Sequence, residues 1–239
     1  MPRTALVLGA RNLGAAITAH LAEGGWTAVA AARSQETVDA AAGRGLDALR
    51  ADAADPADLQ RALGEVAERF GGLDLVVNAV SAARAGGGPF GGGPLADATL
   101  EAYRGWASAV GEQCFVFLSE AARALRAAGE GGTLVQVTGG SSRRAMPGRG
   151  PWAAGAFSVR ALTQAAAQEM RGDGIHVALL IVDATIASPK TADRIAGQPP
   201  EATAAQEDVA RAVSYLASQT ARGFTHELVV TPSGDRWVP

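Results

Sequence analysis

Short apolar runs alternate with longer helical stretches along the whole chain. Ala5–Leu8 and Val177–Val182 are continuous apolar runs, which is typical of parallel strands buried on both faces. Leu13, Ile17 and Leu21 recur at helical spacing, and Gly24 then ends that helix. The predicted strands span residues 5–8, 27–31, 46–51, 73–78, 133–138, 175–182 and 227–231, and the predicted helices span residues 13–23, 37–42, 56–70, 99–128, 152–171 and 206–219.

Single helices between successive strands indicate right-handed βαβ crossovers. The pattern therefore predicts a doubly wound, Rossmann-like parallel sheet of about seven strands, with helices on both faces. At 239 residues, the chain fits one α/β domain over residues 1–239. A chain of this length buries an ample core without covalent crosslinks.

Composition excludes several classes of protein. Hydrophobic residues make up 48% and charged residues 19%, which argues against disorder, and the net charge of −3 predicts no nucleic-acid partner. The lone cysteine, Cys114, cannot form an intramolecular disulfide, and the three histidines lie on separate elements, so we expect no metal site. No apolar run is long enough for a leader peptide or a membrane span, so a cytoplasmic protein without a membrane partner is expected.

The turn after the first strand is the first candidate site. Gly9-Ala10-Arg11-Asn12-Leu13-Gly14 lies where a dinucleotide-binding fold holds pyrophosphate on backbone N–H groups at a helix N-terminus. Glycine permits the tight turn and the close approach of phosphate, but Asn12 stands in place of a middle glycine. A purely structural strand-to-helix turn is the alternative.

The residues after the second and third strands favour NADP over NAD. No acid follows the second strand to accept from the ribose 2′-OH; Arg33 and Ser34 stand there instead, and Arg33 can pair with a 2′-phosphate. Arg11 can reach the same phosphate. Asp52 ends the third strand, where a carboxylate can accept from the adenine amino group. A solvated surface charge is the alternative for Arg33.

With these features the chain resembles the short-chain dehydrogenase/reductase family over almost its full length. The matching segments, in chain order, are the glycine turn Gly9–Gly14, the pair Asp52-Ala53, the strand 73–80 with Asn78, the strand 132–138, and the segment 183–189 after the sixth strand. The resemblance implies an NADP-dependent oxidoreductase in which Ala53 and Asn78 also lie at the cofactor. It further implies a Ser-Tyr-Lys catalytic set, usually joined by an Asn.

None of that catalytic set is present. Trp152 stands at the Tyr position, Ala156 at the Lys position, Gly139 at the Ser position and Gly111 at the Asn position. The only lysine, Lys190, lies beyond the sixth strand. An indole N–H donates a hydrogen bond but cannot supply a proton in general acid catalysis.

Two residues remain as candidates for proton transfer or substrate orientation. Asp183 follows the sixth strand, at the edge where ligands bind in such sheets, and could act as acid or base, although it could equally accept loop N–H groups. Ser141 could orient a substrate oxygen. Two functions stay open: an atypical oxidoreductase of unknown substrate, or a catalytically silent binding protein of the same fold, with or without NADP. Hydride transfer to an iminium or conjugated alkene needs no strong protein acid.

Two further expectations concern surfaces. Gly86–Gly93 holds six glycines in eight residues and is predicted to be a mobile surface loop, either inert or a functional lid. The helices 99–128 and 152–171 present small residues such as Ala161 and Ala165, which suits a two-fold interface and predicts a homodimer or homotetramer.

Overall fold

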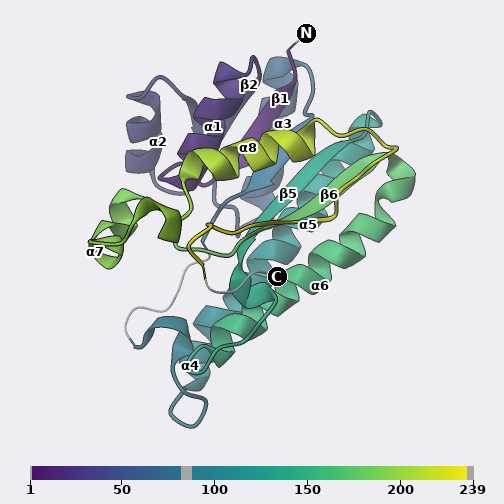
Figure 1. Ribbon diagram of the computed structural model, residues 1–239. Coiled ribbons are helices and arrows are strands. Elements are labelled where there is room, and N and C mark those ends of the chain that lie inside the picture. The colour runs from purple at the N-terminus through teal and green to yellow at the C-terminus, as the bar shows by residue number, and fades with distance from the viewer. Residues whose placement is uncertain (1, 82–87, 236–239) are drawn as a thin grey trace.

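The computed structural model describes residues 2–81 and 88–235 (Figure 1). Its centre is a seven-stranded sheet in the order β3-β2-β1-β4-β5-β6-β7, with every neighbouring pair parallel. The strands are β1 (Thr4–Leu8), β2 (Thr27–Ala32), β3 (Asp47–Arg50), β4 (Leu75–Asn78), β5 (Gly132–Gly139), β6 (Ile175–Val182) and β7 (Glu227–Val230). The predicted doubly wound α/β fold is confirmed.

Helices cover both faces of this sheet. The helices are α1 (Leu13–Glu23), α2 (Gln35–Ala42), α3 (Pro56–Phe70), α4 (Leu100–Tyr103), α5 (Ala109–Ala128), α6 (Gly150–Glu169), α7 (Ala192–Ile195) and α8 (Gln206–Ala217). One core cluster joins α3, α5 and α6 to one face, while separate clusters join α1 and α8, and α2, to the other. The chain reverses its direction of strand addition between β1 and β4, and this switch point is where open α/β sheets bind ligands.

The predicted helix over residues 99–128 contains an irregularity. Thr99 caps α4, whose short α-helix passes into a π-helical segment, Arg104–Ser108, before α5 begins. Gly155 of α6 lets this segment approach closely, because a Cβ there would lie 2.5 Å from the carbonyl oxygen of Trp106. π-turns inside helices are frequent at functional sites, and this one holds Trp106 at the carboxyl edge of the sheet.

The prediction of a surface loop without helix or strand at Gly86–Gly93 is wrong for part of residues 88–93, and the predicted mobility stays a prediction. Phe90–Gly92 forms a 3-10 turn, and Gly93 forms a parallel bridge with Arg149. Gly91–Gly93 is buried, with positive φ angles between 84° and 95°, and a Cβ on Gly92 would lie 2.6 Å from the Pro151 ring. The glycines therefore serve close packing against the start of α6. Residues 86 and 87 lie outside the described residues.

Within the described residues, no helix combines the length and apolar character needed to cross a membrane.

His176 is a titratable group buried in β6. Its side chain is 1% exposed, its ring stacks on Phe224 with centroids 4.3 Å apart, and Nε2 donates to the Thr225 carbonyl at 2.9 Å. Burial lowers the pKa of this imidazole below its usual value of 6.5, because the charged form loses its hydration.

Acidification should therefore destabilise the protein through His176. The unfolded chain binds this proton more tightly, so the contribution is intact above about pH 6.5 and is lost as the pH falls below it, at about 1.4 kcal/mol per unit of pKa depression. Urea unfolding between about pH 5 and 8 should show a flatter stability profile for His176→Gln than for the unmodified chain. The control His20→Gln, at a half-buried position of α1, should keep the original slope. Equal slopes for all three proteins would contradict the prediction.

Candidate cofactor and substrate site

The glycine turn joins β1 to α1 at the switch point of the sheet. Gly9 has a φ of +104°, and its N–H donates to the Ala31 carbonyl at 2.8 Å. A Cβ on Gly14 would lie 1.5 Å from the carbonyl oxygen of Gly9, so no larger residue fits there. The first turn of α1 therefore begins directly against the end of β1, with its free N–H groups at the carboxyl edge. This cradle fits the pyrophosphate of a dinucleotide.

A cavity of about 260 Å³ adjoins this turn. Arg11, Asn12, Arg44 and Pro189 are among its lining residues. Arg44 was missed by sequence reasoning, because it lies in an irregular turn between α2 and β3 and only the fold brings it here. Its Nη2 donates to the Ala10 carbonyl at 3.1 Å, which fixes the backbone beside Arg11.

Arg33 and Ser34 follow β2 at the same edge, and both are exposed. Ser34 caps α2, and its Oγ accepts from the Thr37 N–H at 3.4 Å. Among the described residues, Arg11, Arg33 and Arg44 form no ion pair with a carboxylate, whereas seven other arginines do. Arg11 and Arg44 line the cavity beside the turn, and Arg33 follows β2 at the same edge of the sheet. Guanidinium groups without a carboxylate partner suit a phosphate.

Asp52 and Ala53 follow β3 in a turn that their own neighbours hold in place. The Asp52 N–H donates to Asp58 Oδ2 at 2.7 Å, and Asp52 Oδ1 accepts from the Ala54 N–H at 3.0 Å. The second carboxylate oxygen of Asp52 makes no hydrogen bond within the described residues. The predicted contact of Asp52 with adenine is compatible with this geometry and stays a prediction, as does that of Ala53.

Asn78 lies in a buried amide network at the end of β4. Its Nδ2 donates to Gln136 Oε1 at 2.7 Å and to Gln113 Oε1 at 3.1 Å, and its Oδ1 accepts from the Val80 N–H at 3.2 Å. The side chain is 0% exposed. Asn78 thus ties β4, β5 and α5 together at the carboxyl edge. Its side chain is buried and supports the site, and its predicted contact with the cofactor stays a prediction.

Asp183 is already engaged by an arginine. Its carboxylate pairs with both terminal nitrogens of Arg144, with Oδ1 accepting at 3.1 Å, and the side chain is 8% exposed. Gly140 makes room for this pair, because a Cβ there would lie 1.9 Å from Asp183 Oδ1. Ser141 is also buried in the neighbouring 3-10 turn. The roles suggested for Asp183 and Ser141 remain predictions, and Asp183 would have to act while bound to Arg144.

Trp152 belongs to a cluster of three aromatic rings. Its indole lies 4.8 Å from the Phe90 ring and 5.8 Å from the Trp106 ring, measured between centroids. It also passes over Gly139, where a Cβ would sit 3.9 Å from the indole. The positions of the missing serine and tyrosine are therefore adjacent, and the indole occupies the space between them.

The two other replaced positions are closed by packing. Ala156 is 2% exposed, and a Cβ on Gly111 would lie 2.8 Å from Ser158 Oγ. Neither position has room for a longer polar side chain without rearrangement. Among the described residues, no group of three or more His, Cys, Asp or Glu side chains could hold a metal ion.

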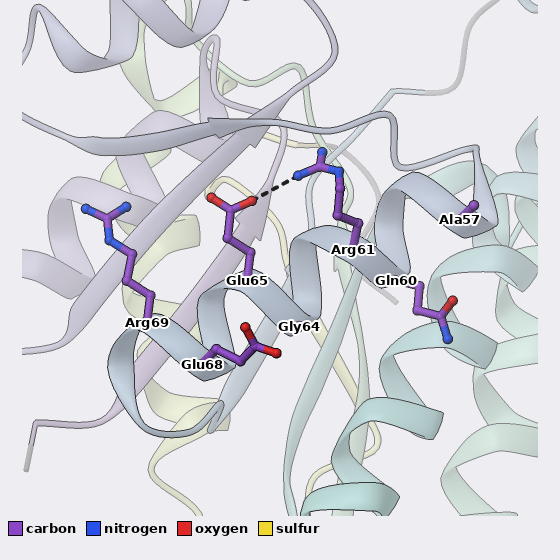
Figure 2. Close-up of a pocket in the computed structure, with 7 residues that line it drawn as sticks. All are labelled: Ala57, Gln60, Arg61, Gly64, Glu65, Glu68 and Arg69. Atoms are coloured by element: carbon purple, nitrogen blue, oxygen red, sulfur yellow. Dashed lines mark hydrogen bonds and ion pairs between the residues drawn. The ribbon is translucent and has the colours of Figure 1, made fainter.

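A second hollow, of about 690 Å³, lies elsewhere on the molecule (Figure 2). All of its lining residues belong to α3, including Arg61, Gly64 and Glu65, and the Arg61–Glu65 ion pair of 2.9 Å crosses its rim. It is a shallow depression over an exposed helix glycine. None of the predicted cofactor or catalytic residues lines this hollow, so we assign it no function.

Comparison with known proteins agrees with this geometry. A family model described as enoyl-(acyl carrier protein) reductase matches residues 7–234. The chain belongs to the short-chain dehydrogenase/reductase family. This is a family of NAD(P)-dependent oxidoreductases, so the glycine turn belongs to a nicotinamide-cofactor fold.

Individual relatives are similar over different lengths. An uncharacterized NAD-dependent oxidoreductase of Mycobacterium tuberculosis is 36% identical over 151 residues, which cover 59% of this chain and 50% of the relative. The chain thus spans about half the length of these first relatives. A sorbitol dehydrogenase of Cereibacter sphaeroides is 31% identical over 73% of this chain and 67% of its own.

Solved structures share the fold across the whole chain. Actinorhodin polyketide ketoreductase with NADPH superposes with a TM-score of 0.82 at 20% identity, covering 99% of this chain and 98% of its own. An alcohol dehydrogenase from the archaeon Thermococcus sibiricus, complexed with 5-hydroxy-NADP, gives 0.80 at 21% identity and covers 100% of both chains.

Proposed function

We propose that this chain is an atypical NADP-dependent oxidoreductase with a non-standard active site. The proposal rests on the cofactor edge, by which we mean the Gly9–Gly14 turn together with Arg11, Arg33 and Arg44 at the carboxyl ends of β1 and β2. Gly9 and Gly14 leave room at the turn for pyrophosphate because they lack a Cβ. Arg11 and Arg44 beside the turn and Arg33 after β2 have no carboxylate partner within residues 2–81 and 88–235. The helix N-terminus suits the pyrophosphate of the cofactor, and the arginines suit the additional 2′-phosphate of NADP.

When bound, NADPH supplies a hydride to the substrate. The residues of this chain bind and orient both partners at the carboxyl edge. Trp152 can donate a hydrogen bond from its indole but holds no transferable proton, and Asp183 and Ser141 are the remaining candidates for assistance. A substrate that accepts hydride without a strong protein acid, such as an iminium or a conjugated alkene, fits this site better than a simple ketone.

A second candidate function is a catalytically silent binding protein. The packing of Phe90, Trp106 and Trp152 favours it, since these rings fill the space that a reacting carbonyl would need. On this alternative, NADP or another ligand would bind without turnover.

The first test is cofactor preference. Fluorescence titration should show that NADPH binds more tightly than NADH, and Arg33→Gln should weaken NADPH binding about tenfold or more while leaving NADH nearly unchanged. Arg69→Gln, an exposed arginine on α3, is the matched control. Equal affinities for the two cofactors, or binding of neither, would remove the basis of the NADP assignment.

The second test is carbonyl reduction. With NADPH, simple ketones and aldehydes should be reduced at rates at least 10²- to 10⁴-fold below ordinary dehydrogenases, because no positioned acid is present. Trp152→Tyr with Ala156→Lys should not restore activity, since Phe90 and Trp106 are packed around an indole and Ala156 is buried. Ordinary turnover, about 1–10³ per second, would show that an acid has been missed; Asp183→Asn and Ser141→Ala would then identify it.

We further propose a homodimer or homotetramer through the outer faces of α5 and α6. Phe115 on α5 is 57% exposed and Phe157 on α6 is 43% exposed, alongside exposed Ala161 and Ala165. Large exposed rings beside small residues suit a two-fold interface. Light scattering should give a dimer or tetramer mass at micromolar concentration, and Phe157→Glu should reduce it to that of one chain, whereas Tyr215→Glu on α8 should not. A monomer mass for the unmodified protein would reject the proposal.

A further inference from the structure

Phe90 presents an exposed ring at the mouth of the candidate substrate site. The residue is 45% exposed, although its ring packs at near right angles on Trp152 and on Trp106, with interplanar angles of 80° and 79°. Gly91 and Gly92 hold the backbone beside it against Arg149 and Pro151. Edge-to-face contacts and close backbone packing fix the orientation of this ring.

Two guanidinium groups from different segments gather on this ring. The Cζ of Arg149 lies 5.4 Å from the centroid of Phe90 and 5.7 Å from that of Trp152, and the Cζ of Arg194 on α7 lies 5.8 Å from Phe90. Neither arginine forms an ion pair with a carboxylate among the described residues. The chain carries a net charge of −3, so it has more acidic than basic side chains. An overall excess of basic residues therefore does not explain why these two arginines lack a carboxylate partner among the described residues.

Guanidinium groups held beside aromatic rings keep their charge and lose part of their hydration. An anion that bridges them gains charge-assisted hydrogen bonds from both. A planar, conjugated body attached to that anion can lie against the exposed ring of Phe90 and loses little conformational freedom when it does so. A flexible aliphatic anion can pair with the two arginines but cannot stack on the aromatic rings. A neutral planar ligand can stack on the rings but cannot pair with the arginines.

We propose that Phe90, Trp152, Arg149 and Arg194, called here the aromatic–arginine cluster, bind a small conjugated anion, such as an unsaturated or aromatic carboxylate. This inference rests on the proposed function in one respect, since it names the class of substrate that would lie beside the nicotinamide. The same class includes conjugated alkenes, to which NADPH would add hydride at the β-carbon while water would supply the proton at the α-carbon, so that the missing tyrosine is not required.

The test uses calorimetric titration of the full chain, with and without saturating NADPH. The probe is trans-cinnamate, which is planar, conjugated and anionic. Cinnamyl alcohol lacks the charge, and cyclohexanecarboxylate lacks the planar conjugated system. We expect cinnamate to bind at least about tenfold more tightly than either analogue. Equal binding of all three, or no binding of cinnamate, overturns the proposal.

Variants locate the binding. Arg149→Gln and Arg194→Gln should each weaken cinnamate about tenfold, and Arg149→Gln keeps the Cβ and Cγ that pack against Gly91. Arg222→Gln, an exposed arginine before β7, is the matched control and should leave cinnamate binding unchanged. A loss of the same size in the control, or no loss in either cluster variant, contradicts the assigned site.

NADPH affinity is titrated separately in the same variants. It should be unchanged in Arg149→Gln. Cinnamate binding without any NADPH binding would refute the proposed cofactor function and leave the ligand site standing. NADPH binding without cinnamate binding would refute the ligand site and leave the proposed cofactor function standing.

Discussion

The packing of Trp152 against Phe90 and Trp106 decides what the carboxyl edge of this sheet can do. Three rings from three segments meet there with centroids 4.8–5.8 Å apart. Gly155 makes the contact possible by letting the π-helical segment approach α6, and the indole lies within van der Waals reach of Gly139 at the end of β5. An indole in this place excludes the proton-donating tyrosine of the family and brings apolar surface to the point where a substrate would react. On the proposed function, the protein's own residues bind and orient the substrate and exclude water.

The cofactor edge depends on backbone rather than on side chains. Gly9 and Gly14 bring the start of α1 into contact with the end of β1, so that unpaired N–H groups face outward, and this arrangement survives the loss of the middle glycine at Asn12. The buried amides of Asn78, Gln113 and Gln136 hold β4, β5 and α5 in register beside it. One half of the site therefore keeps the family's construction while the other half has been rebuilt. Family membership rests on the match over residues 7–234, and the proposal of a non-standard active site rests on the second half.

Periodicity predicted most of the fold because strands such as β1 and β6 are largely apolar runs and several helices carry a recognisable start or stop residue. Asp55 caps α3 and Gly71 ends it with a φ of +79°, and both features are visible in the sequence. The rest could not be predicted, because it depends on contacts between distant segments. Glycine content suggested a loop at residues 86–93, but the packing of Gly91 and Gly92 is dictated by Arg149 and Pro151 at the start of α6. Arg44 likewise carried no local signal, because only the fold brings it to the glycine turn. The sequence also did not show that Arg144 pairs with Asp183, since the two residues lie 39 positions apart.

A crystal structure of the protein grown with NADPH tests the central claim, that an intact cofactor edge adjoins a catalytic position filled by an aromatic cluster. We expect the pyrophosphate against the N–H groups of the Gly9–Gly14 turn, the 2′-phosphate among Arg11, Arg33 and Arg44, and the nicotinamide beside an indole of Trp152 still packed on Phe90. A Trp152 side chain turned out of the cluster, leaving an open pocket with Asp183 released from Arg144 and facing the nicotinamide, would contradict this account.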